Sequence, residues 1–226
     1  KIVILLPIWG REKITKLVLG NLKKLKETQN IEVLTIVSEG WSKIESFKHG
    51  FKWVEASNDD LGHKMNVGIE EAMRLDFDYL MNLGSDDIID DRLFKVYEPY
   101  LKEGRGIFGV TKLTFIDSKE KEAKTFDYNI MIGAGRCIRK DLIKGYVMRD
   151  GKSIMYDKGI KAGLDTNSIK KFKCSHTEID VDFDLIYDIK SDNNIWGYEF
   201  LKGDNISFNK ATKSMGTDLI DGILEL

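Results

Sequence analysis

The sequence has few of the residues that stiffen or cross-link a backbone, with two prolines and two cysteines among 226 residues. Cys137 and Cys174 lack metal-type spacing, and so few cysteines cannot form a disulfide framework. No proline-rich or glycine-rich linker and no internal repeat divides the chain. We therefore expect one domain over residues 1–226, in a reducing compartment that we take to be the cytoplasm.

Long apolar runs and an excess of one charge are also missing. The longest apolar runs, such as residues 2–6, are far shorter than the roughly 18 residues of a membrane span, and no signal-peptide pattern opens the chain. The 35 basic and 37 acidic side chains give a formal net charge of −2, which indicates neither a nucleic-acid nor a membrane surface. A hydrophobic content of 42% is enough for a core.

What the sequence does contain is an alternation of strand-like and helix-like segments. Apolar, β-branched runs predict strands at residues 2–6, 31–40, 52–57 and 78–83. Three-and-four spacing of apolar residues predicts helices before the second and the fourth of these strands, through Ile14, Leu17, Val18, Leu22 and Leu25, and through Met65, Ile69, Ala72 and Met73. This order predicts an α/β fold with a mostly parallel sheet and helices on both faces.

The pattern is looser after Asp90. A helix is expected through Leu93 and Tyr97, and a strand pair or bend over residues 106–117. Residues 133–143 are expected to form a glycine turn that enters a short helix, and the chain from Lys170 onward a smaller mixed sheet.

Polar segments follow the predicted strands, and Ser85, Asp86 and Asp87 come directly after the strand at residues 78–83. Ligands of such sheets bind beyond the carboxyl ends of the strands. Two adjacent carboxylates repel each other unless a cation lies between them, and Mg²⁺ or Mn²⁺ prefers oxygen ligands. The alternative is a solvated turn in which Asp86 or Asp87 caps a following helix.

The order of these motifs resembles the GT-A fold nucleotide-sugar glycosyltransferases, especially those of family 2. The segments concerned are "LLPIWGRE", "IVSEG", "GHKMNVGIEEA" and "LGSDD", the last in the place of the Asp-x-Asp metal motif. The resemblance covers roughly residues 1–143. It implies a GT-A (Rossmann-like) sheet, with a nucleotide-binding half at residues 1–90 and an acceptor-side half at residues 91–226.

The same resemblance implies a metal site and a donor site. Asp87 would be the direct metal ligand, and Asp86 a second ligand or a ribose contact; Ser85 departs from the family by standing where an aspartate often opens the motif. His176 would complete the metal shell, unless it is structural. The implied cofactor is Mn²⁺ or Mg²⁺, and the implied donor is a nucleotide-diphosphate sugar, first of all a UDP-sugar.

Further donor contacts are implied for seven residues. Base and ribose would contact Pro7, Trp9 and Glu39; the diphosphate would contact Arg11, His63 and Lys64; and Asn66 would hold the sugar-nucleotide loop. Four of them have a structural alternative: Trp9 as core, Arg11 at a helix start, Lys64 on a solvated helix face and Asn66 as a satisfied polar residue. Gly135, in "GAGR", would approach the donor sugar or only form a bend.

Sugar transfer with inversion needs a carboxylate that accepts the proton of the acceptor hydroxyl. Asp165 and Asp157 are the candidates, and "GLD" before a helix-like run favours Asp165, although an N-cap or a solvated turn would explain either residue. The acceptor could be a glycan, a small molecule, a protein or a modified nucleic-acid base. A nucleotidyltransferase and a non-catalytic sugar- or protein-binding module remain alternatives, and the first is disfavoured because "PIWGREK" is poor in glycine.

Overall fold

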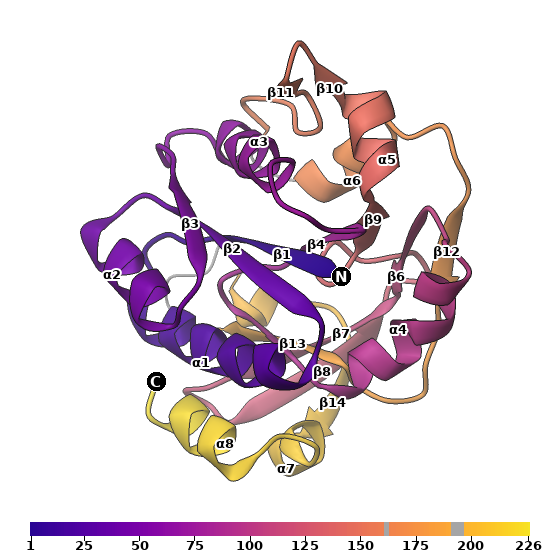
Figure 1. Cartoon of the computed structure of the whole chain (residues 1–226). Coiled ribbons are helices and arrows are strands. Elements are labelled where there is room, and N and C mark those ends of the chain that lie inside the picture. Colours follow the sequence, from indigo (N-terminus) through magenta and orange to yellow (C-terminus); the bar gives the residue numbers. More distant parts are fainter. Residues whose placement is uncertain (161–162, 191–196) are drawn as a thin grey trace.

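The computed structural model describes residues 1–160, 163–190 and 197–226, in which a seven-stranded central sheet has the order β12–β6–β9–β4–β1–β2–β3 (Figure 1). Its strands are β1 (Ile2–Pro7), β2 (Ile31–Val37), β3 (Lys52–Glu55), β4 (Tyr79–Asn82), β6 (Ile107–Val110), β9 (Cys137–Arg139) and β12 (His176–Ile179). All run parallel except β9, which is antiparallel to both β4 and β6. The predicted mostly parallel sheet is therefore confirmed.

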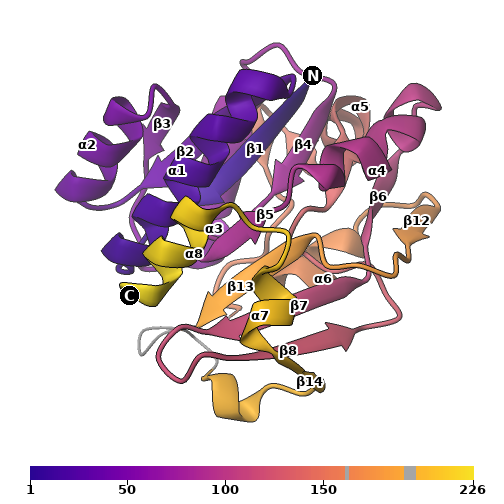
Figure 2. The ribbon, with the colours of Figure 1, turned by 90° about the horizontal axis from the view of Figure 1, so that it is seen from below.

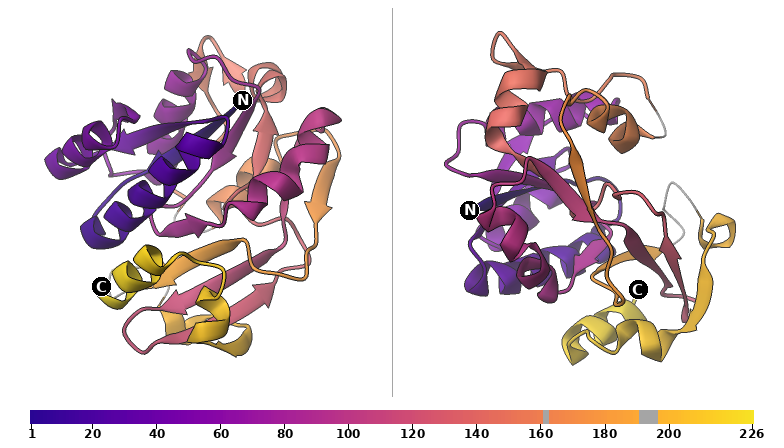
Figure 3. Two further views of the ribbon diagram at one scale, coloured as in Figure 1. Left: turned by 60° about the horizontal axis from the view of Figure 1, so that its bottom comes forward. Right: turned by 90° about the vertical axis from the view of Figure 1, so that its right-hand side faces the viewer.

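A five-stranded sheet of order β14–β8–β7–β13–β5 lies beside the central one. Its strands are β5 (Asp87–Ile89), β7 (Lys112–Asp117), β8 (Glu122–Asp127), β13 (Ile186–Lys190) and β14 (Asp204–Ser207), and a small hairpin joins β10 (Met148–Arg149) to β11 (Lys152–Ser153). In the left view of Figure 3 this second sheet lies below the indigo and purple N-terminal elements. The chain passes between the two large sheets after β4, β5, β6, β8 and β12.

Helices cover both faces of the central sheet, whereas α7 packs against the five-stranded sheet and α8 packs against α1. The helices of the described residues are α1 (Glu12–Thr28), α2 (Gly40–Lys48), α3 (Leu61–Ala72), α4 (Arg92–Lys102), α5 (Lys140–Leu142), α6 (Leu164–Ile169), α7 (Phe208–Thr212) and α8 (Thr217–Leu224), with a π-helical turn at Ile143–Val147 and a 3₁₀ turn at Tyr198–Phe200. None of the helices in the described part of the chain combines the length and the apolar character that crossing a membrane requires.

The two faces follow from the alternation of side chains along β1. Ile2, Ile4 and Leu6 belong to the core that includes α1, whereas Val3 and Leu5 point to the opposite core, which includes α3. Figure 2 shows α8 beside α1, and the ammonium of Lys24 lies 2.9 Å from the Asp218 carboxylate at that contact. A strand buried on both faces explains why β1 reads as a continuous apolar run.

Two expectations need correction, and one helix was not predicted. Residues 137–139 are strand β9 and not the start of a helix, because they pair with β4 on one side and β6 on the other. The smaller sheet is not confined to the C-terminal part: β5, β7 and β8 belong to it, while β12 joins the central sheet. Helix α2 was not predicted, since its apolar side chains include Phe47, which is 78% exposed.

Candidate active site

A cleft of about 580 Å³ lies where the chain crosses between the two large sheets. Its walls include the end of β1, the turn after β4, and the connection from β8 to β9. The sheet architecture predicts this place, because parallel strands leave their carboxyl ends on one edge. Pro7, Trp9, Arg11 and Lys64 line the same cleft.

Three carboxylates meet at the floor of the cleft. Asp86 and Asp87 stand at the start of β5, and Asp188 lies on β13 directly opposite Asp87 in the antiparallel register. One oxygen from each of the three lies within 4.8 Å of the others. Like charges at opposed positions of an antiparallel pair destabilise it, so this arrangement needs compensation.

Burial and mutual repulsion set the protonation of this cluster. Burial, followed by the charges of Asp86 and Asp188, raises the pKa of Asp87 well above its usual range. Burial and then the charge of Asp86 raise the pKa of Asp188 to about 7, against the opposing effect of Lys190. A divalent cation would favour the ionised form of both groups.

The cluster fits a hard divalent cation. Its donors are carboxylate oxygens, which Mg²⁺ and Mn²⁺ prefer. The Oδ1 atom of Asp188 is buried and has no hydrogen-bond partner among the described residues. A buried acceptor left in this way costs free energy unless a ligand engages it.

Two cationic side chains border the cluster. Arg11 Nη1 lies 2.5 Å from Asp86 Oδ2, and Arg11 Nη2 donates to Ser85 Oγ at 3.2 Å. Lys190 Nζ donates to Asp188 Oδ2 at 2.7 Å. The alternative to a metal site, in which Asp86 or Asp87 caps a following helix, is wrong, because strand β5 and not a helix begins at Asp87.

Gly84 lets the backbone approach these carboxylates. Its N–H donates to Asp87 Oδ2 at 2.6 Å, and a Cβ at this position would lie 2.7 Å from Asp87 Oδ2 and 2.8 Å from Asp86 Oδ1. Any side chain here would therefore displace these two carboxylates.

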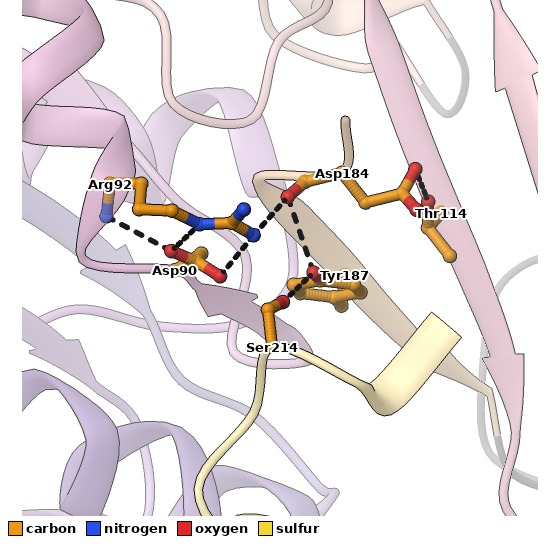
Figure 4. Close-up of polar contacts among 6 residues, drawn as sticks. All are labelled: Asp90, Arg92, Thr114, Asp184, Tyr187 and Ser214. Atoms are coloured by element: carbon orange, nitrogen blue, oxygen red, sulfur yellow. Dashed lines mark hydrogen bonds and ion pairs between the residues drawn. The ribbon is translucent and has the colours of Figure 1, made fainter. Parts of the chain in front are cut away.

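A hydrogen-bond network surrounds Tyr187, the residue that precedes Asp188 on β13 (Figure 4). The Tyr187 hydroxyl lies 2.8 Å from Ser214 Oγ and 3.2 Å from the main-chain oxygen of Asp184. Arg92 donates both to the Asp90 carboxylate, at 2.7 Å, and to the same Asp184 oxygen, at 3.2 Å. These contacts hold β13 against β5 in the register that places Asp188 beside Asp87.

Asp165 lines the same cleft from the first turn of α6. A Cβ on Gly133 would collide with its carboxyl group, so the two residues are in direct contact. Protein atoms crowded around the carboxyl raise the pKa of Asp165, and the Arg136 guanidinium opposes the rise. Arg136 Nη1 donates to the main-chain oxygen of Asp165 at 3.0 Å.

Asp157, the other candidate base, lies outside the lining of this cleft. Its carboxylate pairs with Lys171 Nζ at 2.6 Å on the exposed surface. The structure therefore brings Asp165, and not Asp157, into the cavity that holds the acidic cluster.

Lys64 is fully buried and its ammonium already has three acceptors. It donates to Ile8 O at 2.5 Å, Ser38 Oγ at 2.6 Å and Asn58 Oδ1 at 3.2 Å. Burial lowers its pKa to about 8, opposed by the charge of Glu39. Lys64 thus joins the ends of β1 and β2 to the loop before α3, and it contacts a diphosphate only by giving up one of these bonds.

The predicted base and ribose contacts lie around the end of β1. Trp9 is 53% exposed, so it is not a core residue. Glu39 accepts from Gly10 N at 2.9 Å and borders a second cavity of about 510 Å³ between the ends of β2 and β3. This second cavity adjoins the main cleft through Ser38, which accepts from Lys64.

Four predicted site residues lie elsewhere or have structural contacts. His63 is exposed in α3 and His176 is exposed on edge strand β12; neither lines the cleft. Asn66 bonds with the main chain of Tyr156 and with Ser153 Oγ. Gly135, with φ +74°, donates its N–H to Asn82 O at 2.8 Å and does not line the cleft itself.

Asp188 was not predicted from the sequence. It lies in "IYDIK", where a carboxylate interrupts an otherwise apolar strand and a lysine follows two residues later. A charged pair on one face of a buried strand is an available signal for a site. Its partner strand, however, is 101 residues away in sequence, as 188 − 87 shows.

Comparisons with known proteins identify the fold. No protein-family model matches the chain, and no curated protein matches it. Among solved structures, residues 1–349 of S. aureus TarS superpose with a TM-score of 0.58 at 13% identity, over 84% of this chain and 60% of that one. The chain thus spans about three fifths of that structure, and 37% of a longer TarS structure that matches with a TM-score of 0.57 at 14% identity and over 84% of this chain.

A second fold neighbour is a 4-diphosphocytidyl-2C-methyl-D-erythritol synthase. It superposes with a TM-score of 0.55 at 11% identity, over 80% of this chain and 90% of that one. At identities this low, the superpositions establish a shared fold and nothing more. The chain has the GT-A type of α/β fold that the sequence resemblance predicts.

Proposed function

We propose that this chain is a metal-dependent glycosyltransferase that moves a sugar from a nucleotide-diphosphate sugar, with a UDP-sugar as the preferred donor, to a hydroxyl acceptor with inversion. One observation supports this most: a single cleft contains both the Asp86–Asp87–Asp188 cluster and a separate carboxylate, that of Asp165. Metal-dependent inverting transfer uses both a cation site for the diphosphate and a base for the acceptor.

The site residues have two roles: one group binds the donor and its leaving diphosphate, and Asp165 activates the acceptor hydroxyl. Asp86, Asp87 and Asp188 would hold Mg²⁺ or Mn²⁺, which neutralises charge on a departing diphosphate. Arg11, held against Asp86 and Ser85, adds a planar cation at the same end of the cleft. The exposed Trp9 offers a flat apolar face for the base.

Asp165 would act on the acceptor. Its carboxylate takes the hydroxyl proton while the acceptor oxygen bonds to the anomeric carbon and the bond from that carbon to the diphosphate oxygen breaks. The product is an inverted glycoside, with nucleoside diphosphate released. The raised pKa of Asp165 makes it a better base than an aspartate of ordinary pKa.

A panel of nucleotide sugars, assayed with Mg²⁺ and with Mn²⁺ and with a mixture of hydroxyl acceptors for release of nucleoside diphosphate, tests the proposal. The matched arm supplies nucleoside triphosphates with sugar 1-phosphates and detects pyrophosphate. Release of nucleoside diphosphate, lost on chelation and in Asp87→Ala but kept in Asp182→Asn at an exposed position before β13, is expected. Pyrophosphate release would identify a nucleotidyltransferase instead, and turnover of neither substrate set would indicate a binding module.

A further inference from the structure

Exposed apolar side chains gather at the mouth of the cleft. Trp9, Leu61, Tyr128 and Ile130 all line it, with exposures of 53%, 40%, 39% and 54%. Single exposed apolar residues are normal on a protein surface, but several around one cavity indicate a ligand surface. Trp9 and Leu61 lie on the side of β1 and α3, whereas Tyr128 and Ile130 come from the connection between β8 and β9.

This connection is built to present Tyr128 and Ile130. The Tyr128 ring packs edge-on against Phe126 at 4.6 Å between centroids, and its N–H donates to Thr111 O at 3.1 Å. Met131, only 6% exposed, anchors the segment in the core just after Ile130. The two exposed side chains therefore have a fixed backbone beneath them.

The same segment ends at the candidate base. It continues from Ile130 to Gly133, which is in contact with the Asp165 carboxyl group. At its other end, Tyr128 lines the same cleft as Asp188. Tyr128 and Ile130 thus lie on the wall that extends from Asp165 toward the acidic cluster, where the group bearing the reactive hydroxyl has to bind.

The chemistry of this wall favours an uncharged ring. Residues 128–133 read "YNIMIG" and contain no charged side chain. The nearby Arg136 is 3% exposed, and its terminal nitrogens donate to the main-chain oxygens of Met131 and Asp165, at 3.2 and 3.0 Å. An aromatic ring beside an aliphatic side chain offers an apolar contact for the face of a sugar or an aromatic ring, and nothing for an anion.

We propose that Tyr128 and Ile130 form an acceptor shelf, and that the acceptor is a neutral molecule whose reactive hydroxyl belongs to, or adjoins, a ring with an apolar face. This inference rests on the proposed glycosyl transfer, because it assumes that Asp165 receives the acceptor proton. It excludes small anionic alcohols as preferred acceptors. It also makes the segment with Tyr128 and Ile130 a determinant of acceptor specificity.

Binding of model acceptors to the protein loaded with UDP and Mg²⁺ tests the shelf without requiring turnover. The probes are methyl β-D-glucopyranoside, 4-nitrophenyl β-D-glucopyranoside and glycerol 3-phosphate, followed by saturation-transfer difference NMR. At least one ring probe is expected to bind, and glycerol 3-phosphate is not. Binding of the methyl glycoside identifies the sugar face as the recognised group, and binding of the nitrophenyl glycoside alone identifies an aromatic ring.

Variants locate that binding. Tyr128→Ala and Ile130→Ala should each raise the Kd of the bound ring probe by about 3-fold to 10-fold, the scale of one aromatic or aliphatic contact, and leave the Kd of UDP unchanged. Tyr128→Phe should retain the affinity. Phe47→Ala, which removes a 78% exposed ring on α2, is the matched control.

Two results would overturn the shelf: no ring probe binding to the wild-type protein loaded with UDP, or an unchanged Kd in both alanine variants. Failure of UDP itself to bind with Mg²⁺ would overturn the proposed function instead. The two failures are therefore distinguishable in one experiment.

Discussion

At the residue scale, Asp165 combines access to the cleft with crowding by protein atoms. Contact with Gly133 leaves no space for a side chain on that glycine, and the Arg136 guanidinium partly offsets the rise in the carboxyl pKa. A carboxyl group with a raised pKa holds a proton more tightly once it has taken it, which is the property of a base.

Asp165→Asn should keep UDP and Mg²⁺ binding but lower the transfer rate by about 10²-fold to 10⁴-fold, the usual scale for a general base. Asp157→Asn, the matched control, should change it little because that carboxylate pairs with Lys171 outside the cleft. In the wild-type enzyme kcat/KM should fall as the pH decreases through the pKa of Asp165, which lies above its ordinary value of 3.8.

Steady-state kinetics over a pH series checks both statements. A wild-type kcat/KM that does not fall as the pH decreases, or full activity in Asp165→Asn, would contradict the assignment. Asp157→Asn without activity would transfer the role of base to that residue.

At the element scale, helix α3 fixes the segment that follows β11. Asn66 donates to Tyr156 O at 2.7 Å and accepts from Tyr156 N at 3.0 Å and Ser153 Oγ at 2.9 Å. The Tyr156 hydroxyl in turn accepts from Asn82 Nδ2 at 2.6 Å, at the end of β4. This chain of bonds links α3 to the strand that precedes the acidic turn.

Asn66→Ala should lower the free energy of unfolding by about 2–4 kcal/mol, because three buried partners would lose their hydrogen bonds at roughly 1 kcal/mol or more each. Urea denaturation measures the change. Asn209→Ala, at an exposed position of α7, is the control and should change it little. A loss for Asn66→Ala no larger than that of the control would show that these bonds do not stabilise the segment.

The strength of an element's local sequence pattern determines whether it could be predicted from the sequence. Strands β1, β2 and β4 and helices α1 and α3 have strong local patterns, since the strands are apolar runs and the helices have one buried face. Strand β9 has only three residues, and its state depends on two neighbours distant in sequence. No local signal specifies such pairing.

The candidate site residues also divide into those with a local sequence signal and those that depend on distant pairing. Asp86 and Asp87 were found because they directly follow a predicted strand, and Asp165 because a glycine and a helix-like run flank it. Asp188 joins them only through the pairing of β13 with β5. For Lys64 the residue type suggested a phosphate contact, but its three protein acceptors come from segments whose proximity the sequence does not specify.

At the scale of the whole molecule, the cleft lies at the junction of two sheets, and each supplies part of it. The central sheet provides the end of β1 and the turn after β4, whereas the five-stranded sheet provides Asp87 and Asp188. Ser214, between α7 and α8, holds β13 in place through Tyr187 (Figure 4). The C-terminal segment therefore supports the acidic cluster through β13.

The central claim is that Asp86, Asp87 and Asp188 bind a divalent cation that in turn binds a nucleoside diphosphate. Calorimetric titration of UDP into the protein, in Mg²⁺ and in EDTA, tests it most directly when wild type, Asp188→Asn and the exposed control Asp182→Asn are compared. We predict that UDP binds to wild type and Asp182→Asn only with Mg²⁺, and that Asp188→Asn loses most of this affinity. Equal UDP affinity in Mg²⁺ and EDTA, or unchanged metal-dependent binding in Asp188→Asn, would contradict the account.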